Sequence, residues 1–132
     1  MPGTLKINWS FTSRIDGGPQ LAESVPVLDV SAYDFIKQVL PAPVGPAVST
    51  TTDINLGLGT NPAMIVILAS KYSDKVKYDV DALAVDHVLD GPHLFIGSGA
   101  VPFLGAASPK KLTFTNASTD PITVQVFVGR PA

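Results

Sequence analysis

Apolar and polar residues alternate with a period of two along most of this chain. The alternation runs through residues 5–12, 48–58, 76–81, 85–89, 112–116 and 122–128. Successive side chains of a β-strand point to opposite faces, so this period predicts strands with one face in a hydrophobic core. The first segment places Trp9 among its apolar positions, and we expect Trp9 to be a core residue. Residues 94–96 predict one further, brief strand.

Two segments depart from simple alternation but also predict strands. Residues 63–69 (AMIVILA) are apolar throughout, which is typical of a short central strand covered on both faces. They are expected to form a hairpin with residues 76–80 after a turn at Ser73-Asp74. Residues 21–30 follow a turn signal at 16–19 (DGGP). Pro26 lacks an N–H for the ladder, so it places this stretch at a sheet edge or a bulge.

Residues 31–40 are compatible with two structures. Their apolar residues lie at helical spacing, Ser31 and Asp34 could form a capping box, and Pro41 would end the helix. This local pattern favours a short helix, although tertiary context often overrides local propensity and would make the segment a strand. The proline-rich residues 41–47 then predict a stiff loop or an extended arm.

Together these signals predict a single all-β domain over residues 1–132. Eight or nine short strands with frequent turn residues are typical of an antiparallel β-sandwich or jelly roll. A chain of 132 residues is long enough to bury a core without disulfides, and it contains no cysteine.

The charge content narrows the classes of function. Charged residues make up only 15% of the chain and the net charge is −2, whereas about 25% is typical. Without a basic stripe, nucleic-acid binding is not expected. The apolar run at 63–69 is shorter than the ~20 residues of a membrane helix. Because residues 1–4 lead straight into an alternating segment, no signal peptide is expected. A charge-poor surface suits burial against other chains, and a charge-poor monomer is the alternative.

The stretch 90–105 (DGPHLFIGSGAVPFLG) is the first candidate for chemistry. Gly97 and Gly99 could open a phosphate-binding loop, but a dinucleotide fingerprint needs a third glycine where Pro102 stands, followed by a helix. Gly97-Ser98-Gly99 is also too short for a hydrolase elbow. We therefore interpret the glycines as turn residues beside a sheet, and neither a nucleotide cofactor nor an enzymatic activity is expected.

Metal binding is not expected either. His87 and His93 flank a turn without a recognised ligand spacing, and such histidines are usually surface or half-buried polar residues. The nearby acidic residues could in principle bind Ca²⁺ through their oxygens. They are better interpreted as turn and solvent-facing residues; they are Asp79, Asp81, Asp86 and Asp90.

Several segments, taken in order, resemble a known family. They are the alternating amino-terminal strand leading to GGP at 17–19, SKYSD at 70–74, LDGP at 89–92, LFIGSGAV at 94–101, LTFTN at 112–116 and VQVFVGR at 124–130. This order is similar to that of head decoration, or cement, proteins of tailed bacteriophages. The resemblance implies a β-sandwich or jelly roll made in the host cytoplasm and placed as a dimer or trimer on the capsid exterior. It also implies the major capsid protein as partner, no catalytic residues, and a strand at 31–40.

The contact loop expected from these observations is Val101, Pro102, Phe103 and Leu104. These residues are apolar and uncharged, and Phe103 is the predicted anchor because aromatic side chains often dominate interface energy. The alternative is that Phe103 fills the core of its own domain. The alternative function is a tail- or fibre-associated β-module for host or carbohydrate recognition, which would expose clustered aromatic residues.

Overall fold

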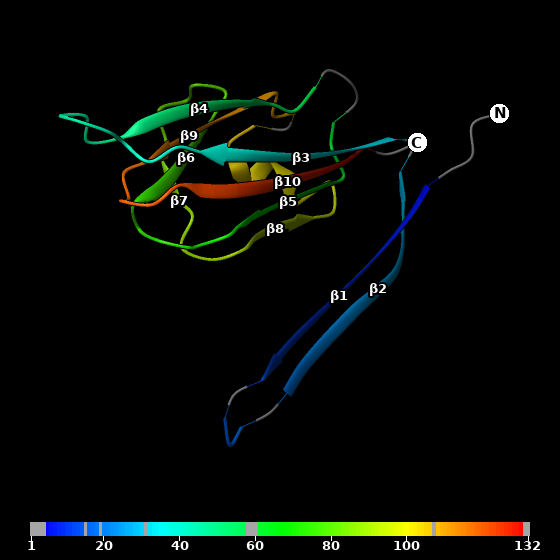
Figure 1. Ribbon diagram of the computed structural model, residues 1–132. Coiled ribbons are helices and arrows are strands. Elements are labelled where there is room, and N and C mark those ends of the chain that lie inside the picture. The colour runs from blue at the N-terminus through cyan, green and yellow to red at the C-terminus, as the bar shows by residue number, and fades with distance from the viewer. Residues whose placement is uncertain are drawn as a thin grey trace.

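The computed structural model describes residues 5–14, 16–18, 20–30, 32–57, 61–106 and 108–130, and only the backbone of 5–14, 20–30 and 32. Eight strands form two four-stranded antiparallel sheets, and two further strands form a separate ribbon (Figure 1). The elements are β1 (Leu5–Arg14), β2 (Gln20–Val30), β3 (Ala32–Leu40), β4 (Thr50–Asn55), β5 (Met64–Ala69), β6 (Val76–Val80), β7 (His87–Val88), β8 (His93–Ile96), the 3-10 helix η1 (Val101–Leu104), β9 (Lys111–Asn116) and β10 (Ile122–Arg130).

The pairing of the strands explains the topology. β3 pairs with β10, β4 with β9, β5 with β8 and β6 with β7. The chain therefore runs out along one half of a long antiparallel ribbon and returns along the other. Rolling this ribbon up produces the strand orders β3-β10-β5-β8 and β4-β9-β6-β7, which is the jelly-roll arrangement of eight strands in two sheets. The prediction of an all-β sandwich with eight or nine strands is confirmed.

The inner faces of the two sheets enclose one hydrophobic core. Alternate residues of each strand face it, as the period of two predicts, and each large apolar side chain buried there contributes roughly 1.5–3 kcal/mol. The core residues of the β3-β10-β5-β8 sheet are Leu40, Ile65, Ile67, Ile122, Val124, Val126 and Val128, and those of the facing sheet are Ile54, Val76, Tyr78, Val80, Leu112 and Phe114.

The segment 32–40 is a strand, so the strand prediction is confirmed over these residues and the short helix favoured by their local pattern is wrong. Ile36 and Leu40 face the core, whereas Tyr33, Phe35 and Val39 are exposed on the other side of β3. Because both faces of this strand carry apolar residues, their spacing imitates that of an amphipathic helix. The nine-residue ladder with β10 overrides the local pattern.

The expected hairpin between residues 63–69 and 76–80 is also wrong. β5 pairs with β10 and β8, while β6 pairs with β9 and β7 in the other sheet. The two strands meet face to face across the core instead of edge to edge. Nor is β5 covered on both faces, since Ile65 and Ile67 are buried but Val66 and Leu68 are only half-buried.

Strands β1 and β2 form a hairpin that stands clear of the sandwich in Figure 1. Its register shifts between Ile7 and Trp9, where two residues of β2, Pro26 and Val27, lie opposite Asn8 alone. Pro26 therefore lies at a bulge, as its missing N–H predicted. The prediction that Trp9 is a core residue concerns a side chain that lies outside the described part of the structure. Residues 41–47 were predicted to be a stiff loop or an extended arm. The connection at 41–49 is a loop with a turn at Gly45.

A buried arginine joins the two sheets near the start of β3. Arg130, 7% exposed, donates a hydrogen bond to the carboxylate of Asp34 at 2.8 Å and another to the backbone carbonyl of Leu56. Asp34 belongs to β3, and Leu56 directly follows β4. The guanidinium thus satisfies a buried carbonyl of the neighbouring sheet.

No helix in the described part of the chain is long and apolar enough to cross a membrane.

Candidate interaction surfaces

The predicted contact loop is the 3-10 helix η1, and its four residues divide into two pairs. Val101 and Leu104 are buried in the core, at 0% and 1% exposure, while Pro102 is exposed and Phe103 is 80% exposed. Phe103 therefore does not fill the core of its own domain. The turn ends at Gly105, whose φ of +105° suits glycine and whose N–H donates to the carbonyl of Pro102. The buried Val101 and Leu104 thus anchor η1 in the core, while the Phe103 ring stays largely exposed.

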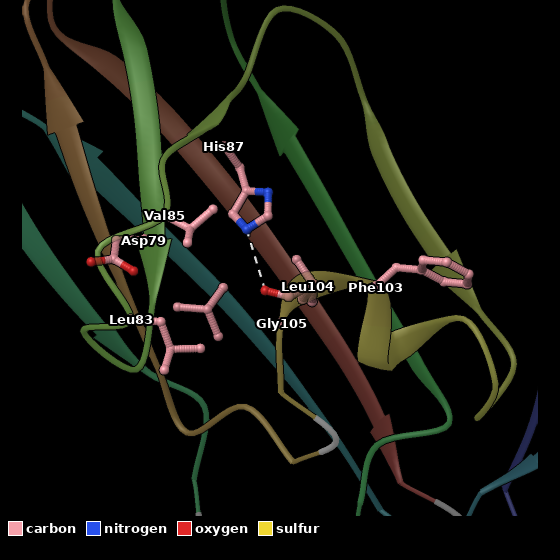
Figure 2. Close-up of a pocket in the computed structure, with 8 residues that line it drawn as sticks. Asp79, Leu83, Val85, His87, Phe103, Leu104 and Gly105 are labelled. Atoms are coloured by element: carbon pink, nitrogen blue, oxygen red, sulfur yellow. Dashed lines mark hydrogen bonds between the residues drawn. The ribbon is translucent and has the colours of Figure 1, made fainter.

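Phe103 borders a small apolar depression (Figure 2). Leu83, 49% exposed, and Val85, 58% exposed, lie on its opposite side. The depression has a volume of about 130 Å³, and Figure 2 shows the Phe103 ring directed away from Leu83 and Val85. We call Leu83, Val85 and Phe103 the end patch. Its apolar character and small volume suit contact with another protein better than enclosure of a substrate.

His87 and His93 make the polar and aromatic contacts next to η1. The Nε2–H of His87 donates to the carbonyl of Leu104 at 3.2 Å, which fastens η1 (Figure 2). The His87 ring stacks on Tyr78, with ring centroids 5.0 Å apart. The hydroxyl of Tyr78 lies 2.6 Å from Nδ1 of His93, so this contact crosses from one sheet to the other. Burial raises the pKa of Tyr78, which keeps the hydroxyl protonated as a donor. Burial also lowers the pKa of His93.

The turn that carries Leu83 has an unusual backbone. Asp81, Ala82 and Ala84 all have positive φ angles, between 51° and 59°, a region that costs energy for residues other than glycine. Asp81 Oδ1 accepts hydrogen bonds from the N–H groups of Lys110 and Lys111, and Asp79 Oδ2 accepts one from Ala84. These carboxylates maintain the turn.

The residues considered as metal ligands or as a phosphate-binding loop make other contacts in the structure. His87 and His93 pack around Tyr78. Asp79 and Asp81 accept hydrogen bonds from backbone N–H groups, as the turn interpretation expected. The solvent-facing interpretation is wrong for Asp79, which is half-buried and whose Oδ1 is buried without a hydrogen-bond partner among the described residues. Within the described ranges no three His, Asp or Glu side chains lie close enough to share a metal ion. Gly97 has a φ of +104° and donates its N–H to the carbonyl of Ala63. It is therefore a turn glycine.

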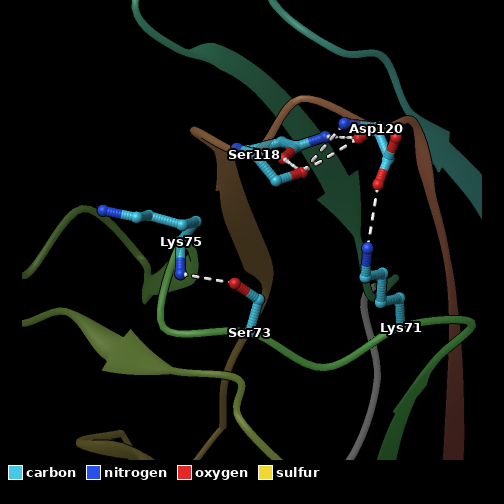
Figure 3. Close-up of polar contacts among 6 residues, drawn as sticks. Lys71, Ser73, Lys75, Ser118 and Asp120 are labelled. Atoms are coloured by element: carbon cyan, nitrogen blue, oxygen red, sulfur yellow. Dashed lines mark hydrogen bonds and ion pairs between the residues drawn. The ribbon is translucent and has the colours of Figure 1, made fainter.

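At the opposite end of the sandwich, polar side chains contact one another beside the loop 41–49, which exposes Val44 and Val48 (Figure 3). Lys71 and Asp120 form an exposed ion pair at 2.9 Å, which raises the pKa of Lys71 through the hydrogen bond and the negative charge of Asp120. Beneath it, the buried Asn116 donates to the backbone carbonyls of Leu40, Pro41 and Asp120 and accepts from Ser118. These groups satisfy one another within turns, and their arrangement is that of a structural tie.

A second apolar surface covers the outer face of the β3-β10-β5-β8 sheet. One register row runs Phe35–Phe127–Val66–Leu94 across all four strands. Phe35 is 57% exposed, and the ring of Phe127 stacks on Tyr33 with centroids 5.6 Å apart. The sequence analysis missed this surface, although the apolar residues on both faces of residues 32–40 and 63–69 were the available signal. We call it the apolar sheet face.

Comparison of the chain with models of protein families, with curated proteins and with solved structures yielded no match in any of the three.

Proposed function

We propose that this protein is a virion structural protein of the capsid decoration, or cement, type. In this role the chain binds the exterior of a phage head through the end patch and holds neighbouring capsid subunits together. The observation that carries the proposal is the placement of Phe103. A large aromatic ring exposed to 80% has no role in the core, yet η1 is anchored by Val101, Leu104 and the hydrogen bond from His87.

Other features support an assembly role of this kind. The jelly roll is shared by viral capsid proteins and lectins, so the fold agrees with the proposal but does not distinguish it from carbohydrate recognition. The end patch favours a protein partner, because its exposed residues Leu83, Val85 and Phe103 include only one aromatic ring for stacking on a sugar. The exposed aromatic cluster of Tyr33 and Phe35 lies on the apolar sheet face instead. A low charge content suits a surface that is covered after assembly.

The test is binding of the purified chain to phage heads prepared without it. Phe103→Asp should leave a folded protein, because the side chain is exposed, and should abolish binding to the heads. Val44→Asp is the matched control, since Val44 is equally exposed but lies in the loop at the other end of the sandwich. It should bind like the unaltered chain.

Heads that carry the chain should also survive heating better than heads that lack it. Equal robustness of the two particle types, or full binding by Phe103→Asp, would contradict the proposal. Attachment to fibres or glycans, with no affinity for heads, would favour the recognition module instead.

A further inference from the structure

The apolar sheet face is exposed in the described part of the chain, and the β1–β2 hairpin stands clear of the sandwich (Figure 1). We propose that the hairpin of one copy packs on the apolar sheet face of a second copy, so that the protein self-associates by exchange of its amino-terminal arm. This inference rests on the proposed assembly role, but it concerns contacts between copies of the chain and is tested without any capsid.

The apolar sheet face offers an extended surface with little charge. Tyr33, Phe35, Val39 and Leu94 are each about half exposed, and Phe127, Val66 and Leu68 between them are half-buried. Among the described side chains of this face, Lys37 is the one charged group. An apolar surface that spans four strands is a liability for a solitary protein and a ready docking site.

The hairpin has the complementary pattern. In its register Leu5 lies opposite Val30, Ile7 opposite Leu28, and Trp9 opposite Val25. The intervening pairs are polar, for example Lys6 with Asp29 and Ser10 with Ser24. Because directly paired positions share a face of the ladder, one face of the ribbon is apolar by sequence and the other polar.

The bulge at Pro26 is required for this arrangement. A shift of one residue moves all later positions of a strand to the other face, and the extra residue in β2 does this between Leu28 and Val25. Without it, Val25 and Leu21 would share a face with polar residues. A two-stranded ribbon with one apolar face is at best marginally stable alone, so this pattern indicates a partner for that face.

The connection between hairpin and sandwich favours a second copy over the chain's own sheet. β2 ends at Val30 and β3 begins at Ala32. Two Cα–Cα steps reach at most about 7.5 Å, whereas stacked β layers lie ~10 Å apart. The hairpin cannot therefore lie on its own sheet without pulling the first residues of β3 off β10. A short connection that prevents docking within one chain promotes exchange between two.

The charges of the two surfaces and the estimated contact area are consistent with docking of the hairpin of a second copy. Glu23, paired with Phe11, is the one charged residue among the register positions of the apolar ribbon face, and it is opposite in sign to Lys37. A ten-residue ribbon is about 30 Å long and ~10 Å wide. Two reciprocal contacts, with both surfaces counted, would bury about 1,200 Å², which exceeds the ~1,000 Å² expected of a specific interface.

The test uses the purified full chain and its natural lack of cysteine. One preparation carries Glu23→Cys and a second, distinguishable by an affinity tag, carries Lys37→Cys. The two are mixed with a short thiol–thiol crosslinker, and mixed products are counted. Lys6→Cys replaces Glu23→Cys in the control, because Lys6 belongs to the polar face of the ribbon. We expect several-fold more product from Glu23→Cys than from Lys6→Cys.

Sedimentation of the unaltered chain and two variants completes the test. The unaltered chain should associate with increasing concentration, and Phe35→Glu should be folded and monomeric. Lys37→Glu should weaken association, and mixing it with Glu23→Lys should restore it. A monomeric unaltered chain, association unchanged in Phe35→Glu, or equal crosslinking by the two hairpin cysteines would overturn the inference. Phe103→Asp should still self-associate, so this proposal and the proposed function can fail separately.

Discussion

The two sheets of this sandwich have similar inner faces but contrasting outer faces. On the outer face of the β4-β9-β6-β7 sheet, the register rows join Thr51 with Thr115 and Asp53 with Thr113, and Lys77 and Lys111 lie on the same side. The corresponding rows of the other sheet contain Phe35, Phe127, Val66 and Leu94. One face is suited to water, whereas the other is suited to a partner.

This difference does not arise from the fold, because a single rolled ribbon generates both sheets. Threonine and phenylalanine both favour strands, so either outer face could form with either composition. The core likewise requires only the inner residues. We infer that the apolar sheet face is explained by interaction, and the polar face by solubility.

The largest expected effect compares two phenylalanines. Phe114→Ala removes a fully buried ring and should lower the free energy of unfolding by about 3–5 kcal/mol. Phe35→Ala removes a ring from the apolar sheet face and should change it by less than ~0.5 kcal/mol. Urea denaturation of dilute protein measures both values, since self-association would otherwise add stability. Comparable losses in the two variants would mean that Phe35 is covered within its own chain.

A smaller effect is expected where polar groups hold the two sheets together. Arg130→Met should cost about 1–3 kcal/mol, because the carbonyl of Leu56 loses its hydrogen bond in a buried position. Lys71→Met, which removes the exposed ion pair with Asp120, should give no measurable change. Thermal unfolding of both variants provides the comparison. Equal sensitivity at the two positions would show that burial of Arg130 is not what makes its contacts matter.

The smallest effect concerns the contact between Tyr78 and His93, which spans the two sheets. Burial lowers the pKa of His93, the negative charge of Asp90 opposes this shift, and the neighbouring His87 adds to it. The unfolded chain therefore takes up a proton first, and stability should fall as the pH drops below the ordinary histidine pKa of about 6.5. His93→Gln should flatten this dependence in denaturation series between about pH 7 and pH 5. Unchanged dependence in His93→Gln, or its loss in His87→Gln instead, would contradict the assignment.

Periodicity was sufficient to predict the strands and to indicate which residues share a face. It could not show which face of a strand is the inner one when both are apolar, and this is why residues 32–40 imitated a helix and residues 63–69 a fully covered strand. It also could not show that β5 and β6 enter different sheets, because nearness in sequence favours a hairpin and only the rolled ribbon separates them. The exposed position of Phe103 depends on its buried neighbours Val101 and Leu104, a division that a uniformly apolar loop does not reveal.

We propose that the two separate apolar surfaces of the molecule, the end patch and the apolar sheet face, bind different partners. Hydroxyl-radical footprinting measures the accessibility of individual side chains and tests this most directly. In dilute solution Tyr33, Phe35 and Phe103 should all be oxidised. On self-association only Tyr33 and Phe35 should become protected, and on addition of phage heads Phe103 should become protected as well. Oxidation of Tyr33 and Phe35 at the same rate in all three states would contradict the account.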